Sequence, residues 1–149
     1  MVEKKDIENF GEVFPLIKTA VGWSAKEFGD RIGVSRQTIN NYENGKKIDK
    51  TNYIAMRYVL EAEIAENKEN TKMLPVVLDA FVDRRDQYTD ADREEIKQKV
   101  DMMNKVSKSV SKKDASKIWD AVIVSGISAI ALAAISTIVA AFWRKKQRR

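Results

Sequence analysis

One short stretch of the chain gathers side chains that form directional hydrogen bonds. If Ile39 and Tyr42 face inward on a helix that Ser35 caps, the outward positions carry no acidic group until Glu43. An arginine bonds to guanine through two contacts, a glutamine or asparagine bonds to adenine in the same way, and all of these groups also bond to phosphate. The chemistry available here is recognition of base edges and phosphates. The outward positions are Arg36, Gln37, Thr38, Asn40 and Asn41.

Composition argues against catalysis elsewhere in the chain. The 149 residues include no His and no Cys, so the commonest metal ligand and the commonest general base are both missing. No glycine-rich phosphate loop and no paired carboxylates in an apolar setting are found. We therefore predict that the protein is not an enzyme and that it holds no metal and no cofactor.

Two short helices joined by a tight turn are expected to position this stretch. Ser24 and Glu27 fit a capping box that starts the first helix, and Ser35 caps the second. Gly33 supplies the positive φ that a tight turn between helices requires. Gly29 falls where a side chain would crowd the neighbouring helix. A bracing helix, a tight turn and a second helix that presents its first two turns together form a helix-turn-helix. The positions predicted to face inward are Phe28, Ile32, Ile39 and Tyr42.

Further helices are expected on both sides. One carries Leu16 to Val21, with Pro15 in its first turn and Gly22 at its end. Another follows a cap at Thr51. Its inward residues are predicted to be Ile54, Val59, Leu60 and Ile64.

The stretch resembles the Cro/C1-type (XRE) helix-turn-helix family of bacterial and phage regulators. The resemblance covers about residues 12–66 and implies a five-helix, lambda-repressor-like domain that binds palindromic operator DNA as a homodimer. The residues that carry it are Trp23-Ser24, Phe28-Gly29, Ile32 to Ser35, Thr38-Ile39 and Tyr42 to Lys46.

The resemblance also implies roles for individual residues. Ala25 stands where family members often have a glutamine that touches a phosphate, so one phosphate contact is weakened. Gly29 departs from the usual Ala and loosens the helix by roughly 1 kcal/mol. The base-reading residues would be Arg36, Gln37, Asn40 and Asn41. The contacts to the DNA backbone would come from Ser24, Thr38, Asn44, Lys46 and Lys47.

Residues 71–118 are predicted to form a helical stalk and a juxtamembrane linker. Met73 to Phe81 is an apolar helical patch interrupted by Pro75, which either packs back on the first domain or forms a groove for a partner. Thr89 and Asp92 give a cap signature for a helix over Asp90 to Val110. That helix is interpreted either as a solvated single helix or as a short coiled-coil seam. The seam residues would be Ile96, Val100, Met103 and Val110, and Ser107 to Lys117 would form a flexible linker.

A predicted membrane span follows. Ala121 to Trp143 is a run of 23 residues without a charge, long enough to cross the roughly 30 Å hydrocarbon core. Trp119 and Trp143 bracket it, and a basic tail from Arg144 to Arg149 follows. A buried helix of a soluble oligomer is the alternative. Small residues recur at every fourth position, which favours self-association within the bilayer. They are Ala121, Ser125, Ala129, Ala133, Thr137 and Ala141.

Together these features predict an all-α protein with three parts: residues 1–70 for DNA binding, 71–118 for the stalk and linker, and 119–149 for the transmembrane helix and basic tail. The corresponding function is a membrane-anchored transcriptional regulator, a repressor acting as a dimer. It would be a single-pass protein of the cell membrane, with its N-terminal domain in the cytoplasm. The alternative is a membrane adaptor whose helix-turn-helix domain binds a protein partner instead of DNA.

Overall fold

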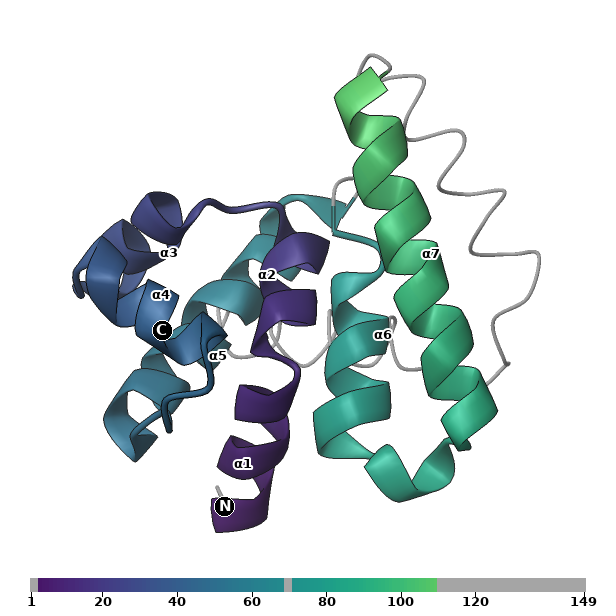
Figure 1. Cartoon of the computed structure of the whole chain (residues 1–149), viewed down its shortest axis with the longest axis horizontal. Coiled ribbons are helices and arrows are strands. Elements are labelled where there is room, and N and C mark those ends of the chain that lie inside the picture. The colour runs from purple at the N-terminus through teal and green to yellow at the C-terminus, as the bar shows by residue number, and fades with distance from the viewer. Residues whose placement is uncertain (1–2, 69–70, 110–149) are drawn as a thin grey trace.

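The computed structural model describes residues 3–68 and 71–109, and every regular element in those ranges is a helix (Figure 1). The all-α fold class is therefore confirmed for this part of the chain. Five α-helices lie within residues 3–68: α1 (Lys4–Glu12), α2 (Phe14–Val21), α3 (Ala25–Ile32), α4 (Arg36–Glu43) and α5 (Lys50–Glu66). Residues 71–109 form α6 (Leu74–Leu78), the π-helical turn η2 (Asp79–Asp83), the 3-10 turn η3 (Arg85–Gln87) and α7 (Asp90–Ser109).

Local signals in the sequence set the bounds of α2, α3 and α4. The backbone N–H of Glu27 donates to Ser24 Oγ at 3.1 Å, and that of Thr38 donates to Ser35 Oγ at 3.1 Å. Both of these predicted N-caps are confirmed. Gly22 ends α2 and Gly33 ends α3, with φ of 76° and 77°. Side chains disfavour this left-handed conformation, so the predicted glycine turns are confirmed as well.

Helix α5 starts earlier than predicted, and of its predicted inward residues Leu60 and Ile64 are confirmed as buried while Val59 is partly buried. Its N-cap is Asp49, whose Oδ1 accepts from the backbone N–H of Asn52 at 2.7 Å, so the predicted cap at Thr51 is wrong. Ile54 is also placed wrongly by the sequence pattern, because it is 49% exposed. The buried residues of α5 repeat at helical spacing and point to the core. They are Tyr53, Met56, Leu60 and Ile64.

A cluster of aromatic rings centred on Phe14 joins the first five helices. The Phe14 ring centroid lies 6.1 Å from that of Phe10 in α1, 5.3 Å from Phe28 in α3 and 6.3 Å from Tyr42 in α4. Phe10 in turn meets Tyr53 of α5 edge to face at 5.1 Å. Such pairs contribute about 0.5–1.5 kcal/mol each beyond the apolar area they bury. The cluster therefore fixes α1, α3 and α4 on α2, and α5 on α1.

A second layer, made of α6, η2 and α7, packs on α1 and α2 and extends the same core. In Figure 1, α6 lies between the α1–α2 pair and α7. Pro75 lies in the first turn of α6, so it starts this helix and does not interrupt it. Of the two interpretations of Met73 to Phe81, packing back on the first domain is confirmed. The buried apolar residues of this segment are Met73, Leu74, Val76, Val77, Leu78, Ala80 and Phe81, and Val82 next to it is buried as well.

Helix α7 packs its apolar face against the core of the molecule. The predicted cap is confirmed, because Asp92 N–H donates to Thr89 Oγ1 at 3.1 Å and Thr89 N–H donates to Asp92 Oδ2 at 3.0 Å. Ile96, Val100 and Met103 are buried in the common core, and α7 packs on α2. A solvated single helix and a coiled-coil seam are therefore both wrong for the described part of α7. Residues 71–109 pack on the first five helices, while the domain boundaries at residues 70 and 118 stay predictions.

An ion pair with two hydrogen bonds ties the second layer to α5. Arg57 of α5 donates from Nη1 and Nη2 to the two carboxylate oxygens of Asp83 in η2, at 2.8 Å each. Burial alone lowers the pKa of Arg57, but the hydrogen bonds and charge of Asp83 outweigh it, and the pKa is raised. Arg57 thus stays charged, and its bonds to Asp83 hold together two elements that are far apart in the sequence.

The π-helical turn positions a second polar cluster at the end of η2. The backbone N–H of Arg84 donates to the carbonyl of Asp79, and the Arg84 guanidinium donates to both carboxylate oxygens of Asp79 at 2.8 Å. The Tyr88 hydroxyl also donates to this buried carboxylate. Burial raises the pKa of Tyr88, and the hydrogen bond to Asp79 and then the charge of Asp79 raise it further. The carboxylate of Asp79 is therefore satisfied by two partners close to it in the chain.

None of the helices within residues 3–68 and 71–109 has both the length and the apolar character that crossing a bilayer requires. The predicted span, Ala121 to Trp143, lies outside the described residues, as does most of the predicted linker. Helix α7 continues to Ser109, so the first residues of that linker are helical. The membrane anchor stays a prediction.

Replacing Asp83 tests the tie between the two layers. The substitution Asp83→Ala should lower the free energy of unfolding by about 2–4 kcal/mol, because it leaves the charged Arg57 side chain, only 16% exposed, without its main partner. Urea unfolding of the full-length protein in mild detergent, followed by circular dichroism, measures this. The exposed pair of Lys26 and Asp30 is the control, and Asp30→Ala should cost less than about 0.5 kcal/mol. Equal costs for the two substitutions would contradict a structural role for the Arg57 pair.

Candidate nucleic-acid interface

Helices α3 and α4 lie at the end of the molecule opposite α7 (Figure 1). Their backbones approach closely at Gly29, where an added Cβ would lie 2.6 Å from the carbonyl oxygen of Val34 and 3.3 Å from that of Ser35. The prediction that a side chain here would crowd the neighbouring helix is confirmed. Gly29 therefore permits the spacing that places the start of α4.

The outward face of α4 carries the predicted base-reading residues. The two inward positions, Ile39 and Tyr42, are buried as predicted, with 0% and 4% exposure. A helix held on one side in this way presents its opposite side to solvent. The roles of the accessible residues in base reading stay predictions. Among them, Arg36 and Gln37 are exposed, and Asn40 and Asn41 are half-buried.

Hydrogen bonds within α4 order part of this face. Gln37 Nε2 donates to Asn41 Oδ1 at 2.9 Å, so two of the predicted base-reading side chains are joined. The hydroxyls of Ser35 and Thr38 lie 2.9 Å apart and share a hydrogen bond at the start of the helix. The outward face thus consists of the hydrogen-bonded pair of Gln37 and Asn41 together with Arg36, Thr38 and Asn40.

The predicted contacts to the DNA backbone flank α4. Ser24 is exposed at the start of α3, and Thr38 is half-buried in the first turn of α4. Asn44, Lys46 and Lys47 are exposed in the loop after α4. This loop folds back on the helix, since the backbone N–H of Lys46 donates to the carbonyl of Asn41 at 3.0 Å. The structure therefore places these groups next to the outward face, and their contacts with phosphates stay predictions.

The charge around α4 favours an anionic ligand. Glu43, the one acidic residue of α4, forms an ion pair with Lys18 of α2 at 2.7 Å. This pair turns the carboxylate away from the outward face and anchors the end of α4. Within residues 3–68 and 71–109, no acidic group pairs with Arg36, Lys46 or Lys47. Their positive charge is therefore available to phosphates.

Residues 16–57 match the family model described as helix-turn-helix. The match begins in α2, includes all of α3 and α4, and ends within α5. It covers under a third of the chain. Comparison with curated proteins and with solved structures finds no match. The resemblance to XRE-type helix-turn-helix proteins is thus confirmed for this segment, and the family match does not reach the predicted anchor.

Arg31 of α3 contacts Trp23 and α5 and so stabilises the helix-turn-helix. No pattern in the sequence predicts these contacts. The Arg31 guanidinium lies 4.0 Å from the centroid of the Trp23 ring and 3.7 Å from the carboxylate of Glu63 in α5. Trp23 also meets Phe28 edge to face at 5.2 Å. Because Arg31 spans from α3 to α5, the bracing helix is fixed at its C-terminal end as well as at Gly29.

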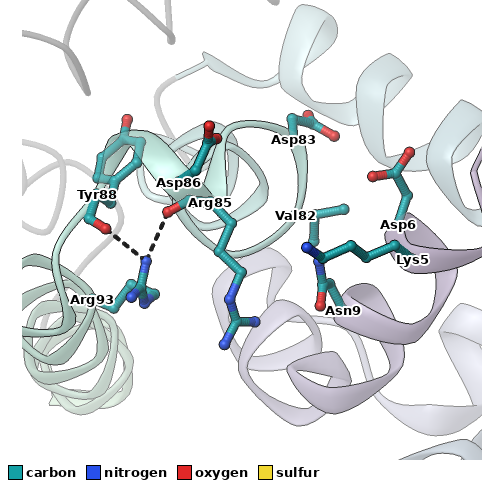
Figure 2. Close-up of a pocket in the computed structure, with 9 residues that line it drawn as sticks. All are labelled: Lys5, Asp6, Asn9, Val82, Asp83, Arg85, Asp86, Tyr88 and Arg93. Carbon is teal, nitrogen blue, oxygen red and sulfur yellow. Dashed lines mark hydrogen bonds between the residues drawn. The ribbon is translucent and has the colours of Figure 1, made fainter.

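A separate open cleft of about 480 Å³ lies between α1 and the segment from η2 to α7 (Figure 2). Arg93 Nη1 donates to the carbonyls of Arg85 and Tyr88 at 2.9 Å each, as the dashed lines in Figure 2 show. Asp83 is held by Arg57. These groups hold the fold together, and their arrangement indicates no reaction. The lining residues are Lys5, Asp6, Asn9, Val82, Asp83, Arg85, Asp86, Tyr88 and Arg93.

Within the part of the chain that the structure describes, no three acidic side chains are grouped so as to hold a metal ion. That the protein is not an enzyme, and that it binds no metal or cofactor, stay predictions.

Two Gly-to-Ala substitutions test the close approach of α3 and α4. Gly29→Ala should lower the free energy of unfolding by about 1–3 kcal/mol, because the new Cβ forces two backbones apart and outweighs a gain of about 1 kcal/mol in helix propensity. Gly11→Ala in α1 is the matched control. No atom lies within 4 Å of its added Cβ, so this variant should be stabilised by up to about 1 kcal/mol. If urea unfolding showed that both variants change the free energy of unfolding in the same direction, the turn between α3 and α4 would be able to widen without cost, and the predicted clash at Gly29 would be contradicted.

Proposed function

We propose that this protein is a membrane-anchored, sequence-specific DNA-binding regulator of transcription. The observation that carries the proposal is the outward face of α4, which is polar, holds no free acidic group and lies on a segment that matches the helix-turn-helix family. In this proposal α4 enters the major groove, where Arg36, Gln37 and Asn40 face the base edges. Lys46 and Lys47 would meet phosphates beside the groove.

The proposal includes a homodimer on a palindromic operator. Helix α4 has only eight residues, so its outward face contacts only a few base pairs. A second copy at fixed spacing is therefore needed to recognise a specific site. Repression is the outcome we propose, because it is the commoner one in the Cro/C1-type family that residues 12–66 resemble. A bound dimer would then block access to the DNA it covers.

The proposed anchor is the uncharged run Ala121 to Trp143, with the helix-turn-helix in the cytoplasm, where DNA is accessible. The support comes from the length of this run, from its flanking Trp119 and Trp143, and from the basic tail that follows. The partners would be the operator, the lipid bilayer, a second copy of the chain and, through the span, another membrane protein.

Selection of random duplex DNA by the full-length protein in mild detergent tests the DNA-binding part. The wild type should enrich a two-fold symmetric site. The double variant Arg36→Ala/Gln37→Ala should bind that site at least about 30-fold more weakly, because two base contacts are lost. Raising the salt concentration from 50 to 200 mM should weaken wild-type binding steeply.

The matched control is Lys97→Ala/Gln98→Ala, which removes an exposed cation and an exposed amide from α7 at the other end of the molecule. It should bind as the wild type does. If a folded, dimeric wild-type sample enriches no site, the DNA-binding proposal fails, and the alternative of a membrane adaptor that binds a protein partner takes its place.

Fractionation of cells tests the anchor. The full-length protein should sediment with membranes, and deletion of residues 119–149 should move it to the soluble fraction because the apolar run is lost. Deletion of residues 144–149 alone removes the basic tail and keeps the run, so that variant should stay with the membranes. Membrane sedimentation of the protein that lacks 119–149 would contradict the anchor.

A further inference from the structure

Gln37 and Asn41 form a hydrogen-bonded pair on the outward face of α4. They lie one helical turn apart, and Gln37 Nε2 donates to Asn41 Oδ1 at 2.9 Å. Gln37 is exposed and Asn41 is half-buried. The family resemblance implies a base-reading role for each of these residues, and the structure joins them through a single hydrogen bond.

The bond leaves Gln37 with one particular set of free groups. A primary amide has two N–H donors and one carbonyl oxygen. Asn41 takes one donor, so Gln37 keeps one donor and its carbonyl oxygen. Adenine presents the complement in the major groove, because its N6 amino group donates and its N7 accepts. Guanine presents two acceptors there, O6 and N7, and one of these would face the Gln37 oxygen without a donor between them.

The orientation of Asn41 also sets which way the Gln37 amide faces. With Asn41 Oδ1 directed toward Gln37, as in the structure, a turned-over Gln37 amide would place its carbonyl oxygen against that oxygen, and two acceptors would meet. A long side chain otherwise loses conformational freedom when it binds, and a side chain held in its bound geometry loses less. The pair therefore favours one orientation of the Gln37 amide before any DNA is present.

We infer that Asn41 is a positioning residue that holds Gln37 for adenine, and that Asn41 does not itself read a base. The inference rests on the proposed DNA-binding function, and it specifies that Gln37 selects an A·T base pair. Asn40, on the other flank of Gln37, has no side-chain partner within the described residues and stays free to read a base of its own.

The test measures discrimination with the full-length protein in mild detergent, on the operator obtained by selection. For each base pair of the half-site, the discrimination ratio is the Kd for the substituted site divided by the Kd for the selected site. The wild type should prefer adenine at one position by at least about tenfold. Gln37→Ala should abolish the preference there, which identifies the position that Gln37 reads.

Asn41→Ala should lower the discrimination ratio at that same position about three- to tenfold and leave the ratios at the other positions unchanged. Adding Asn41→Ala to Gln37→Ala should cause no further loss there, because the first substitution removes the group that Asn41 holds. Asn40→Ala is the matched control, since it removes a neighbouring asparagine that is not bonded to Gln37. Its effect should fall on a different base pair.

Asn41→Asp separates positioning from a merely structural role. The carboxylate keeps the acceptor that Gln37 needs, so the preference for adenine should return to the wild-type ratio. The overall affinity should fall, because the new negative charge repels phosphates. All variants should unfold at the same urea concentration within error, since this pair lies at the surface.

Three results would overturn the inference: loss of discrimination at a second base pair in Asn41→Ala, unchanged discrimination in that variant, or a base other than adenine at the position that Gln37 reads. Failure of the proposed function is distinct from these. In that case the wild type itself selects no site, and both the function and the inference are rejected.

Discussion

The contacts of Phe14 are the constraint on which the rest of the structure depends. Its ring is fully buried and meets rings from α1, α3 and α4, so α2 is the element to which the helix-turn-helix is fixed. One turn further along α2, Lys18 forms the ion pair with Glu43 at the end of α4. Helix α4 is thus anchored to α2 by the aromatic contact of Tyr42 and by the ion pair of Glu43. Because both anchors come from the same helix, the direction in which α4 presents its amides is set by α2.

The second layer completes this arrangement from the other side. α2, α3 and α4 have eight residues each, and isolated helices of that length are unstable in water. α6 and α7 pack on α2, and the bond between Arg57 and Asp83 joins α5 to η2. The helix-turn-helix and the second layer therefore share one core and one central helix. A displacement of α7, the described element nearest in sequence to the proposed anchor, would have to be accommodated at α2, to which α4 is also fixed.

Much of the candidate site could be predicted from the sequence because its signals are local. The Ser24 and Ser35 caps and the Gly33 turn each depend on residues within a few positions, and all three are found. What could not be predicted depends on contacts between distant residues. The spacing of Ile96 and Val100 indicates an apolar helix face, but spacing alone does not say whether a second chain or α2 covers it. The bond between Gln37 and Asn41 is local too, but it depends on side-chain rotamers, which residue type does not specify.

The charge of the chain bears on why a membrane anchor and a DNA-reading face would occur together. Residues 1–70 carry a net charge of −1, and the groups that read bases in our proposal are mostly neutral amides. With about three cations available to phosphates in each copy, Arg36, Lys46 and Lys47, one copy alone would bind a half-site weakly at physiological salt. A linked pair binds its second half-site at an effective concentration set by the linker, on the order of millimolar when the linker is short. Holding two copies side by side in a bilayer would supply that link without adding positive charge. Specificity would then rest on the amides of α4, and affinity on the pairing of two chains.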